Sequence, residues 1–216
     1  MAVLSISGGY MIKICGLKNV TEAEWVTEAG ADLAGMVLFF PKSKRNIDID
    51  TAKEIMAALG DGVKSVAVTV TPSIEQIKQI EAAGFDYLQY HGALGEELLA
   101  DIDIPVIKAF NVKDVSDIKC FVDNERIVGF VFDANAPGSG VGFDYKVLNS
   151  VRLEIEAAEA KGKFVLLAGG LGPDNVAEAL RLTGFKGVDT SSGVENENGD
   201  GKSREKIFKF IENAHS

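Results

Sequence analysis

Residues 164–174 read Phe164-Val-Leu-Leu-Ala-Gly-Gly-Leu-Gly-Pro-Asp174, and residues 187–194 read Gly187-Val-Asp-Thr-Ser-Ser-Gly-Val194. Each stretch begins as a short apolar run, typical of a buried strand, and ends in small residues before the next helical pattern. Glycine lets backbone N–H groups approach a ligand, and a helix start adds partial positive charge. Two such turns on successive units predict one shared phosphate site, as after the last two strands of a (β/α)8 barrel. Alternatively, the glycines only make tight strand-to-helix turns.

The rest of the chain repeats the same alternation of strand and helix. Apolar, β-branched runs occur near residues 11–14, 33–39, 64–70, 86–90, 104–109, 126–132, 163–168 and 186–189. Helical patterns separate them, with no break in composition and no low-complexity linker, which favours one domain. We therefore predict an α/β fold, a single-domain (β/α)8 TIM barrel with short loops over residues 11–216. Residues 1–10 form an N-terminal extension of undetermined role.

Several helices carry start signals. Capping patterns occur at Thr21-x-x-Glu24, Thr51-x-x-Glu54 and Ser73-x-x-Gln76. Ser or Thr followed three residues later by Glu or Gln satisfies the free N–H groups of a first turn. Asp174 is the expected cap of a helix over residues 175–182, and the last helix is predicted over residues 203–213.

Composition excludes several classes of function. The net charge is −10 with a sequence pI near 4.8, and no basic run offers a nucleic-acid surface. No apolar stretch approaches the roughly 20 residues of a membrane span, and residues 1–10 lack the pattern of a signal peptide. We therefore expect a cytoplasmic protein that binds neither nucleic acid nor membrane. Cys15 and Cys120 are the only cysteines and there are two histidines, so we predict no disulfide framework and no metal site.

The first strand separates a closed barrel from an open dinucleotide-binding sheet. Ile12-Lys-Ile-Cys-Gly-Leu-Lys-Asn19 supplies one glycine, where a dinucleotide site needs G-x-G-x-x-G. Gly138-Ser-Gly-Val-Gly142 follows the sixth run and is better interpreted as a flexible loop. In a barrel, chemistry is carried at the C-terminal ends of the strands. The reactive side chains expected to face that mouth are Cys15, Arg45, His91, Lys108, Asp133 and Asp189. Each also has an ordinary interpretation, for example a buried apolar Cys15 or a turn-forming Asp133.

Six ordered blocks resemble one known family. They are Lys13-Ile-Cys-Gly16, Phe39-Phe-Pro-Lys-Ser-Lys-Arg45, Leu88-Gln-Tyr-His-Gly92, Phe132-Asp-Ala-Asn-Ala-Pro-Gly-Ser-Gly140 leading to Phe143-Asp-Tyr145, Leu167-Ala-Gly-Gly-Leu-Gly-Pro-Asp-Asn-Val176 and Gly187-Val-Asp-Thr-Ser-Ser-Gly-Val-Glu195. From about Met11 to the last helix the chain resembles the phosphoribosylanthranilate isomerases of tryptophan biosynthesis. Small departures from the family pattern fall at Lys44, Tyr90 and Thr190.

The resemblance implies an Amadori rearrangement, an aldose-to-ketose isomerisation that gives 1-(2-carboxyphenylamino)-1-deoxyribulose 5-phosphate without metal or organic cofactor. It assigns Asp133 as general acid, Cys15 as general base and Arg45 as the residue that holds the anthranilate carboxylate. The implied substrate-binding residues, including the phosphate cradle, are Arg45, His91, Asp189, Gly169, Gly170, Ser192 and Gly193.

Other functions stay open at this point. A different sugar-phosphate isomerase is one; the histidine-pathway enzyme would be expected to carry aspartate in place of Cys15. A Schiff-base aldolase would use Lys108, and a phosphate-binding barrel without catalysis would need neither Cys15 nor Asp133. The partner in each case is a small phosphorylated molecule, and the sequence does not reveal the oligomeric state.

Overall fold

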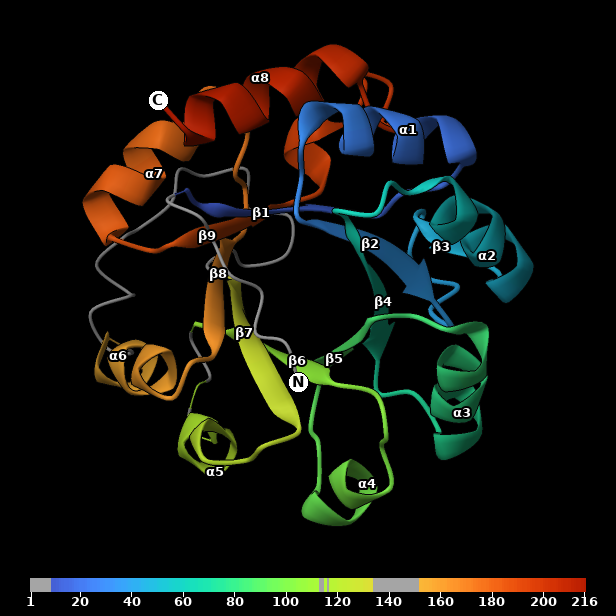
Figure 1. Cartoon of the computed structure of the whole chain (residues 1–216), viewed down its shortest axis with the longest axis vertical. Helices are drawn as coiled ribbons and strands as arrows, with labels where there is room; N and C mark the ends of the chain where they lie inside the picture. The colour runs from blue at the N-terminus through green and yellow to red at the C-terminus, as the bar shows by residue number, and fades with distance from the viewer. Residues whose placement is uncertain (1–8, 113–114, 116, 134–151) are drawn as a thin grey trace.

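The computed structural model describes residues 9–112, 115, 117–133 and 152–216, in which eight parallel strands close into a barrel (Figure 1). The strands are β1 (Met11–Cys15), β2 (Leu33–Leu38), β4 (Lys64–Val70), β5 (Tyr87–His91), β6 (Val106–Asn111), β7 (Ile127–Asp133), β8 (Phe164–Ala168) and β9 (Gly187–Thr190). Their order is β1-β9-β8-β7-β6-β5-β4-β2, and pairing of β1 with β2 closes the ring. The predicted barrel is confirmed. The Gly138–Gly142 loop lies outside the described residues.

An additional short strand, β3 (Asn46–Ile47), pairs with the end of β2 and was not expected from the sequence. The helices are α1 (Val20–Ala29), α2 (Ile49–Ala58), α3 (Ile74–Ala83), α4 (Glu96–Ala100), α5 (Ile118–Val122), α6 (Arg152–Ala160), α7 (Val176–Thr183) and α8 (Arg204–Ala214). They form the outer ring in Figure 1, where α8 packs between α1 and α7. Among the described residues, no helix is long and apolar enough to cross a membrane.

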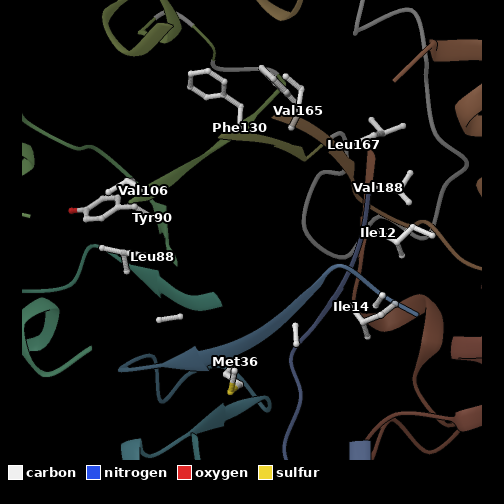
Figure 2. Packing of buried hydrophobic residues seen from close by; sticks show 14 of the residues in the cluster. Ile12, Ile14, Met36, Leu88, Tyr90, Val106, Phe130, Val165, Leu167 and Val188 are labelled. Carbon is white, nitrogen blue, oxygen red and sulfur yellow. The ribbon is translucent and has the colours of Figure 1, made fainter. Parts of the chain in front are cut away.

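Strand side chains alternate between two apolar layers because successive residues of a strand point to opposite faces. The outer layer lies between strands and helices and includes Ile12, Ile14 and Val188 (Figure 2). The inner layer fills the barrel with Met11, Leu33, Val37, Val66, Val68, Ile107, Val131 and Leu166. Residues 11, 13 and 15 of β1 therefore face inward, and so do residues 129, 131 and 133 of β7. This alternation decides which side chains reach the mouth.

The helix starts correct two of the three predicted capping patterns. Asn19 caps α1 by accepting from the Glu22 N–H at 3.0 Å, and Asp48 caps α2 by accepting from the Thr51 N–H at 2.8 Å. Thr21 and Thr51 already lie inside these helices, where a side chain no longer faces the free N–H groups. Both hydrogen bonds of the capping box at Ser73 are present, which confirms that prediction.

The last two helices give one correction and one confirmation. Asp174 does not cap α7. Asn175 is the N-cap residue there, but its amide turns back to the preceding loop instead of the helix. Ser203 caps α8, whose bounds are one residue from the prediction.

Candidate active site

Strand β1 brings two reactive side chains to the barrel interior, Cys15 at its end and Lys13 below it. Cys15 is 8% exposed and Lys13 is fully buried. Gly35 of β2 pairs with Cys15, and a Cβ atom at Gly35 would lie 2.9 Å from Cys15 Sγ and 3.0 Å from Lys13 Nζ. Glycine is thus required at position 35 to leave room for both groups. The sequence interpretation missed Lys13 and Gly35, although a lysine at an inward position of a buried strand was a usable signal.

Lys13 forms a buried ion pair with Asp189 of β9, with Nζ 3.0 Å from Oδ1. Burial disfavours the Lys13 ammonium, but the opposite charges of Asp189 and of the Cys15 sulfur outweigh burial, so the pKa of Lys13 lies above its ordinary value. Burial raises the pKa of Asp189, which Lys13 opposes and repulsion from Asp133 reinforces. Asp133 closes β7, so the Lys13–Asp189 pair interacts with Cys15 on one side and Asp133 on the other.

His91 closes β5 as predicted and belongs to the same interior. The Gln89 side-chain amide nitrogen lies 2.8 Å from His91 Nε2. Burial, with the positive charges of Lys13 and Lys108, lowers the pKa of His91 to about 4. His91 is therefore a neutral imidazole at neutral pH, able to form a hydrogen bond but not an ion pair.

The prediction that Lys108 ends its strand is wrong. Strand β6 continues to Asn111, so Lys108 does not end it, and inward-facing Ile107 and Ala109 flank it. Its ammonium lies 4.5 Å from the centre of the Phe110 ring and donates to the Ala109 carbonyl at 2.7 Å. Lys108 thus packs among the Phe110 and Phe121 rings beside α5. Lys108 nevertheless lines the same cavity as His91 and Asp133.

The two glycine-rich turns follow β8 and β9 and pack against each other. Gly169 and Gly170 have φ of 101° and 65°, in the left-handed region that favours glycine. A Cβ atom at Gly193 would collide with the Leu171 carbonyl, which also accepts a hydrogen bond from Thr190 Oγ1 at 2.6 Å. Ser192 starts the short 3-10 helix η2 (Ser192–Val194). Gly193 thus joins the turns to each other, whatever the turns bind.

Arg45, in the loop between β2 and β3, lies against the end of β1. A Cβ atom at Gly16 would be 2.5 Å from Arg45 Cδ, so the arginine passes directly over the residue after Cys15. Its Nε donates to Glu195 Oε1 at 2.5 Å. The sequence correctly placed Arg45 at the mouth but did not predict its partner.

Glu195 is a buried carboxylate held by three cations. Besides Arg45, Lys44 Nζ lies 2.8 Å and Lys202 Nζ 3.5 Å from its oxygens. Burial would raise the pKa of Glu195, but the hydrogen bonds from Arg45 and Lys44 and the charge of Lys202 lower it to about 2. Lys202 also donates to the Ser191 carbonyl, and Ser191 Oγ donates to the Cys15 carbonyl at 2.9 Å. This network connects the turn after β9, Arg45 and Cys15. No sequence motif pointed to it.

Comparison with known proteins identifies this arrangement. Residues 12–213 match the family described as N-(5'phosphoribosyl)anthranilate (PRA) isomerase. The chain belongs to the N-(5'-phosphoribosyl)anthranilate isomerase family. It is an aldose–ketose isomerase on a TIM barrel, and the family resemblance drawn from the six sequence blocks is confirmed.

Relatives match the isomerase chain over most of its length. The N-(5'-phosphoribosyl)anthranilate isomerase of Neisseria meningitidis serogroup C is 39% identical, covering 94% of this chain and 95% of the relative. That of Streptococcus gordonii is 36% identical, covering 93% and 95%. The crystal structure from Thermotoga maritima has a TM-score of 0.80 and 34% identity, over 95% of this chain and 98% of that one. A phosphoribosyl anthranilate isomerase in complex with reduced 1-(o-carboxyphenylamino)-1-deoxyribulose 5-phosphate has a TM-score of 0.77 and 32% identity, over the same shares.

Proposed function

We propose that Cys15 is the general base and Asp133 the general acid in the isomerisation of N-(5'-phosphoribosyl)anthranilate by this chain. One observation carries the proposal. Cys15 and Asp133 each occupy an inward-facing position at the end of a strand of the same barrel, and the Lys13–Asp189 ion pair interacts with both. A pair of titratable groups held at one mouth is the arrangement that acid–base catalysis requires.

The chemistry divides between the two residues. The Asp133 carboxylic acid donates its proton to the ribose ring oxygen, the C1–O bond breaks, and the nitrogen lone pair forms a Schiff-base cation. That cation acidifies the neighbouring C–H, so the Cys15 thiolate removes the proton from C2 and the electron pair forms an enolamine. Tautomerisation gives the ketose. Atoms balance without an external reductant, because isomerisation only moves protons and electron pairs within the substrate.

The remaining residues are assigned to binding. Arg45 fits the anthranilate carboxylate, because a planar guanidinium forms two parallel hydrogen bonds with a carboxylate and Glu195 holds this one by its Nε. The left-handed turn at Gly169 and Gly170, with Ser192 and Gly193 on the adjoining turn, fits the phosphate. The phosphorylated ligand of the solved relative supports a substrate of this class. His91 and Asp189 are left to hydrogen-bond the sugar.

Nothing comparable favours the alternatives. A Schiff-base aldolase needs an accessible amine at the mouth, whereas Lys108 lies between the Phe110 and Phe121 rings. A purely binding barrel gives no reason to place a thiol and a carboxyl group at the ends of β1 and β7.

A direct assay tests the proposal. The purified protein is incubated with phosphoribosylanthranilate, and consumption of the substrate is followed by its fluorescence. We expect turnover by the wild-type chain and strong loss in Cys15→Ser and Asp133→Asn. Lys53→Met, at an exposed position of α2, is the control and should retain turnover. Borohydride trapping with a ketose phosphate completes the test, since covalent capture would support the aldolase instead.

A further inference from the structure

Lys13 is the fully buried charged group of the mouth that the proposed acid–base chemistry does not use. Taking an ammonium out of water costs several kcal/mol unless a partner compensates. Asp189 is one partner, at 3.0 Å. A well-packed apolar pair would fill the same space without that cost, so the ion pair is expected to serve something besides stability.

The position of Gly35 shows what else the ammonium faces. Cys15 Sγ and Lys13 Nζ lie 2.9 and 3.0 Å from the same point, the place where a Cβ atom of Gly35 would be. The sulfur and the nitrogen are therefore at most about 6 Å apart, the range in which an opposite charge stabilises an ionised group. Because glycine has no side chain, no side-chain atom of residue 35 fills the space between the sulfur and the nitrogen.

We propose that Lys13 is a positioning residue of the isomerase, whose ammonium stabilises the thiolate form of Cys15 while Asp189 limits how strongly it does so. The inference rests on the proposed role of Cys15 as the base. When Cys15 takes the substrate proton its charge disappears, and Lys13 keeps Asp189 as counter-ion. The ammonium is thus paired at every stage of the cycle.

Other charges also face this pair and set the background against which Lys13 acts. Lys202 lies behind Ser191, which bonds to the Cys15 carbonyl. The Arg45 side chain passes over Gly16, the residue that follows Cys15. Asp133, two strands away on β7, acts on Asp189, and His91 on β5 is affected by the Lys13 charge. Asp189 accepts a hydrogen bond from Lys13 and competes with Cys15 for its charge, so it is the informative second site for mutation.

The test is the pH dependence of alkylation by iodoacetamide, since only the thiolate reacts. The rate is measured separately for the Cys15 and Cys120 peptides by mass spectrometry. Cys120 is exposed and far along the chain, which makes it an internal control in every variant. In Lys13→Met we expect the midpoint of the Cys15 profile to move up by about one pH unit, a tenfold slower reaction near neutrality. In Asp189→Asn it should move down, because Lys13 is then left with Cys15 as its partner. The Cys120 profile should not move.

The opposite signs distinguish this role from a structural one, because loosened packing would expose Cys15 in both variants and shift both in one direction. Unchanged midpoints, or shifts of the same sign, overturn the inference. If Lys13→Met does not fold, the downward shift in Asp189→Asn decides alone. The proposed function fails separately: Cys15→Ser with wild-type turnover removes Cys15 as the base, whatever the alkylation profiles show.

Discussion

Two of the buried lysines lie at opposite ends of the barrel, and their partners differ. Lys13 at the mouth faces the Asp189 carboxylate and the Cys15 thiol, and its pKa is raised. Lys163, just before β8 at the barrel floor, donates to the carbonyls of Asn124 and Ile127 at 2.7 and 2.5 Å. Burial lowers the pKa of Lys163. Carbonyl dipoles hold a cation but never titrate, whereas a carboxylate and a thiol exchange protons. The partners of a buried charge therefore distinguish a lysine that ties chain segments together from one that faces groups able to exchange protons.

Cavity size does not make the same distinction. The floor has a cavity of about 590 Å³ lined by Tyr87, Phe164 and Lys163, while the cavity beside His91 and Asp133 measures about 420 Å³. The larger cavity lies at the N-terminal ends of the strands, the end of a TIM barrel that usually serves stability and not catalysis. The titratable groups at the strand ends, and not the volume of the cavity, therefore indicate which end carries the proposed active site.

The sharpest way to break the comparison is to remove the proposed acid and the proposed base at the mouth. Cys15→Ser and Asp133→Asn should each lower kcat by roughly 100-fold or more with little change in substrate affinity. The double variant should lose less than the product of the single losses, because both groups serve one sequence of proton transfers. Steady-state kinetics on folded variants decide this. Wild-type turnover in both variants would show that Cys15 and Asp133 serve only to pack the mouth.

Arg45→Ala should cost about 1.5–3 kcal/mol of substrate affinity, since a charge-assisted contact to a carboxylate is lost. Arg45→Lys should rescue poorly, because an ammonium does not reproduce the planar fork. Titration calorimetry with reduced 1-(o-carboxyphenylamino)-1-deoxyribulose 5-phosphate gives the affinities, and Lys53→Ala on the exposed face of α2 is the control. Equal affinity in Arg45→Ala and the wild type would make Arg45 only a partner of Glu195.

At the floor, Lys163→Met should lower the free energy of unfolding by about 1–3 kcal/mol, because two carbonyls lose a charged donor. The kcat should not change. Urea unfolding measures the first and the fluorescence assay the second. A fall in kcat without a loss of stability would mean that the two ends of the barrel do not differ as described.

His91 gives the smallest effect and a clear sign. Its folded pKa of about 4 lies below the ordinary 6.5, so the unfolded chain binds a proton first as the pH falls. The stability from neutral His91 is present above pH 6.5 and is lost as the pH falls towards 4, with about 1–2 kcal/mol lost between pH 6.5 and 5. His91→Gln should lose less stability over that window, as measured by urea unfolding at a series of pH values. Identical pH dependence in both proteins would show that His91 is not held neutral by the fold.

Much of this fold was readable from the sequence because each strand is an apolar run with its own boundaries. The strand ends at Cys15, His91 and Asp133 lie where the pattern put them, so the acid–base pair could be predicted to share one mouth. Lys108 was predicted to end its strand, but β6 continues three residues further to Asn111.

The unpredicted part of the site is what depends on contacts between distant segments. The partners of Arg45 and Lys13 lie 150 and 176 residues away along the chain. No periodicity encodes such pairs. The role of Gly35 could not be predicted either, because it is visible only when β1 is placed beside β2.

The interlocked turns after β8 and β9 carry a consequence for laboratory evolution. The Leu171 carbonyl accepts from Thr190 Oγ1 and occupies the space that a side chain at position 193 would need. Positions 171, 190 and 193 are therefore epistatic. A library that randomises one turn loses the variants that clash with the other turn before their ligand preference can be tested. Variants that accept a different anion should emerge as coordinated substitutions across both turns, and grafting one turn onto another barrel should succeed only when its neighbour is transferred with it.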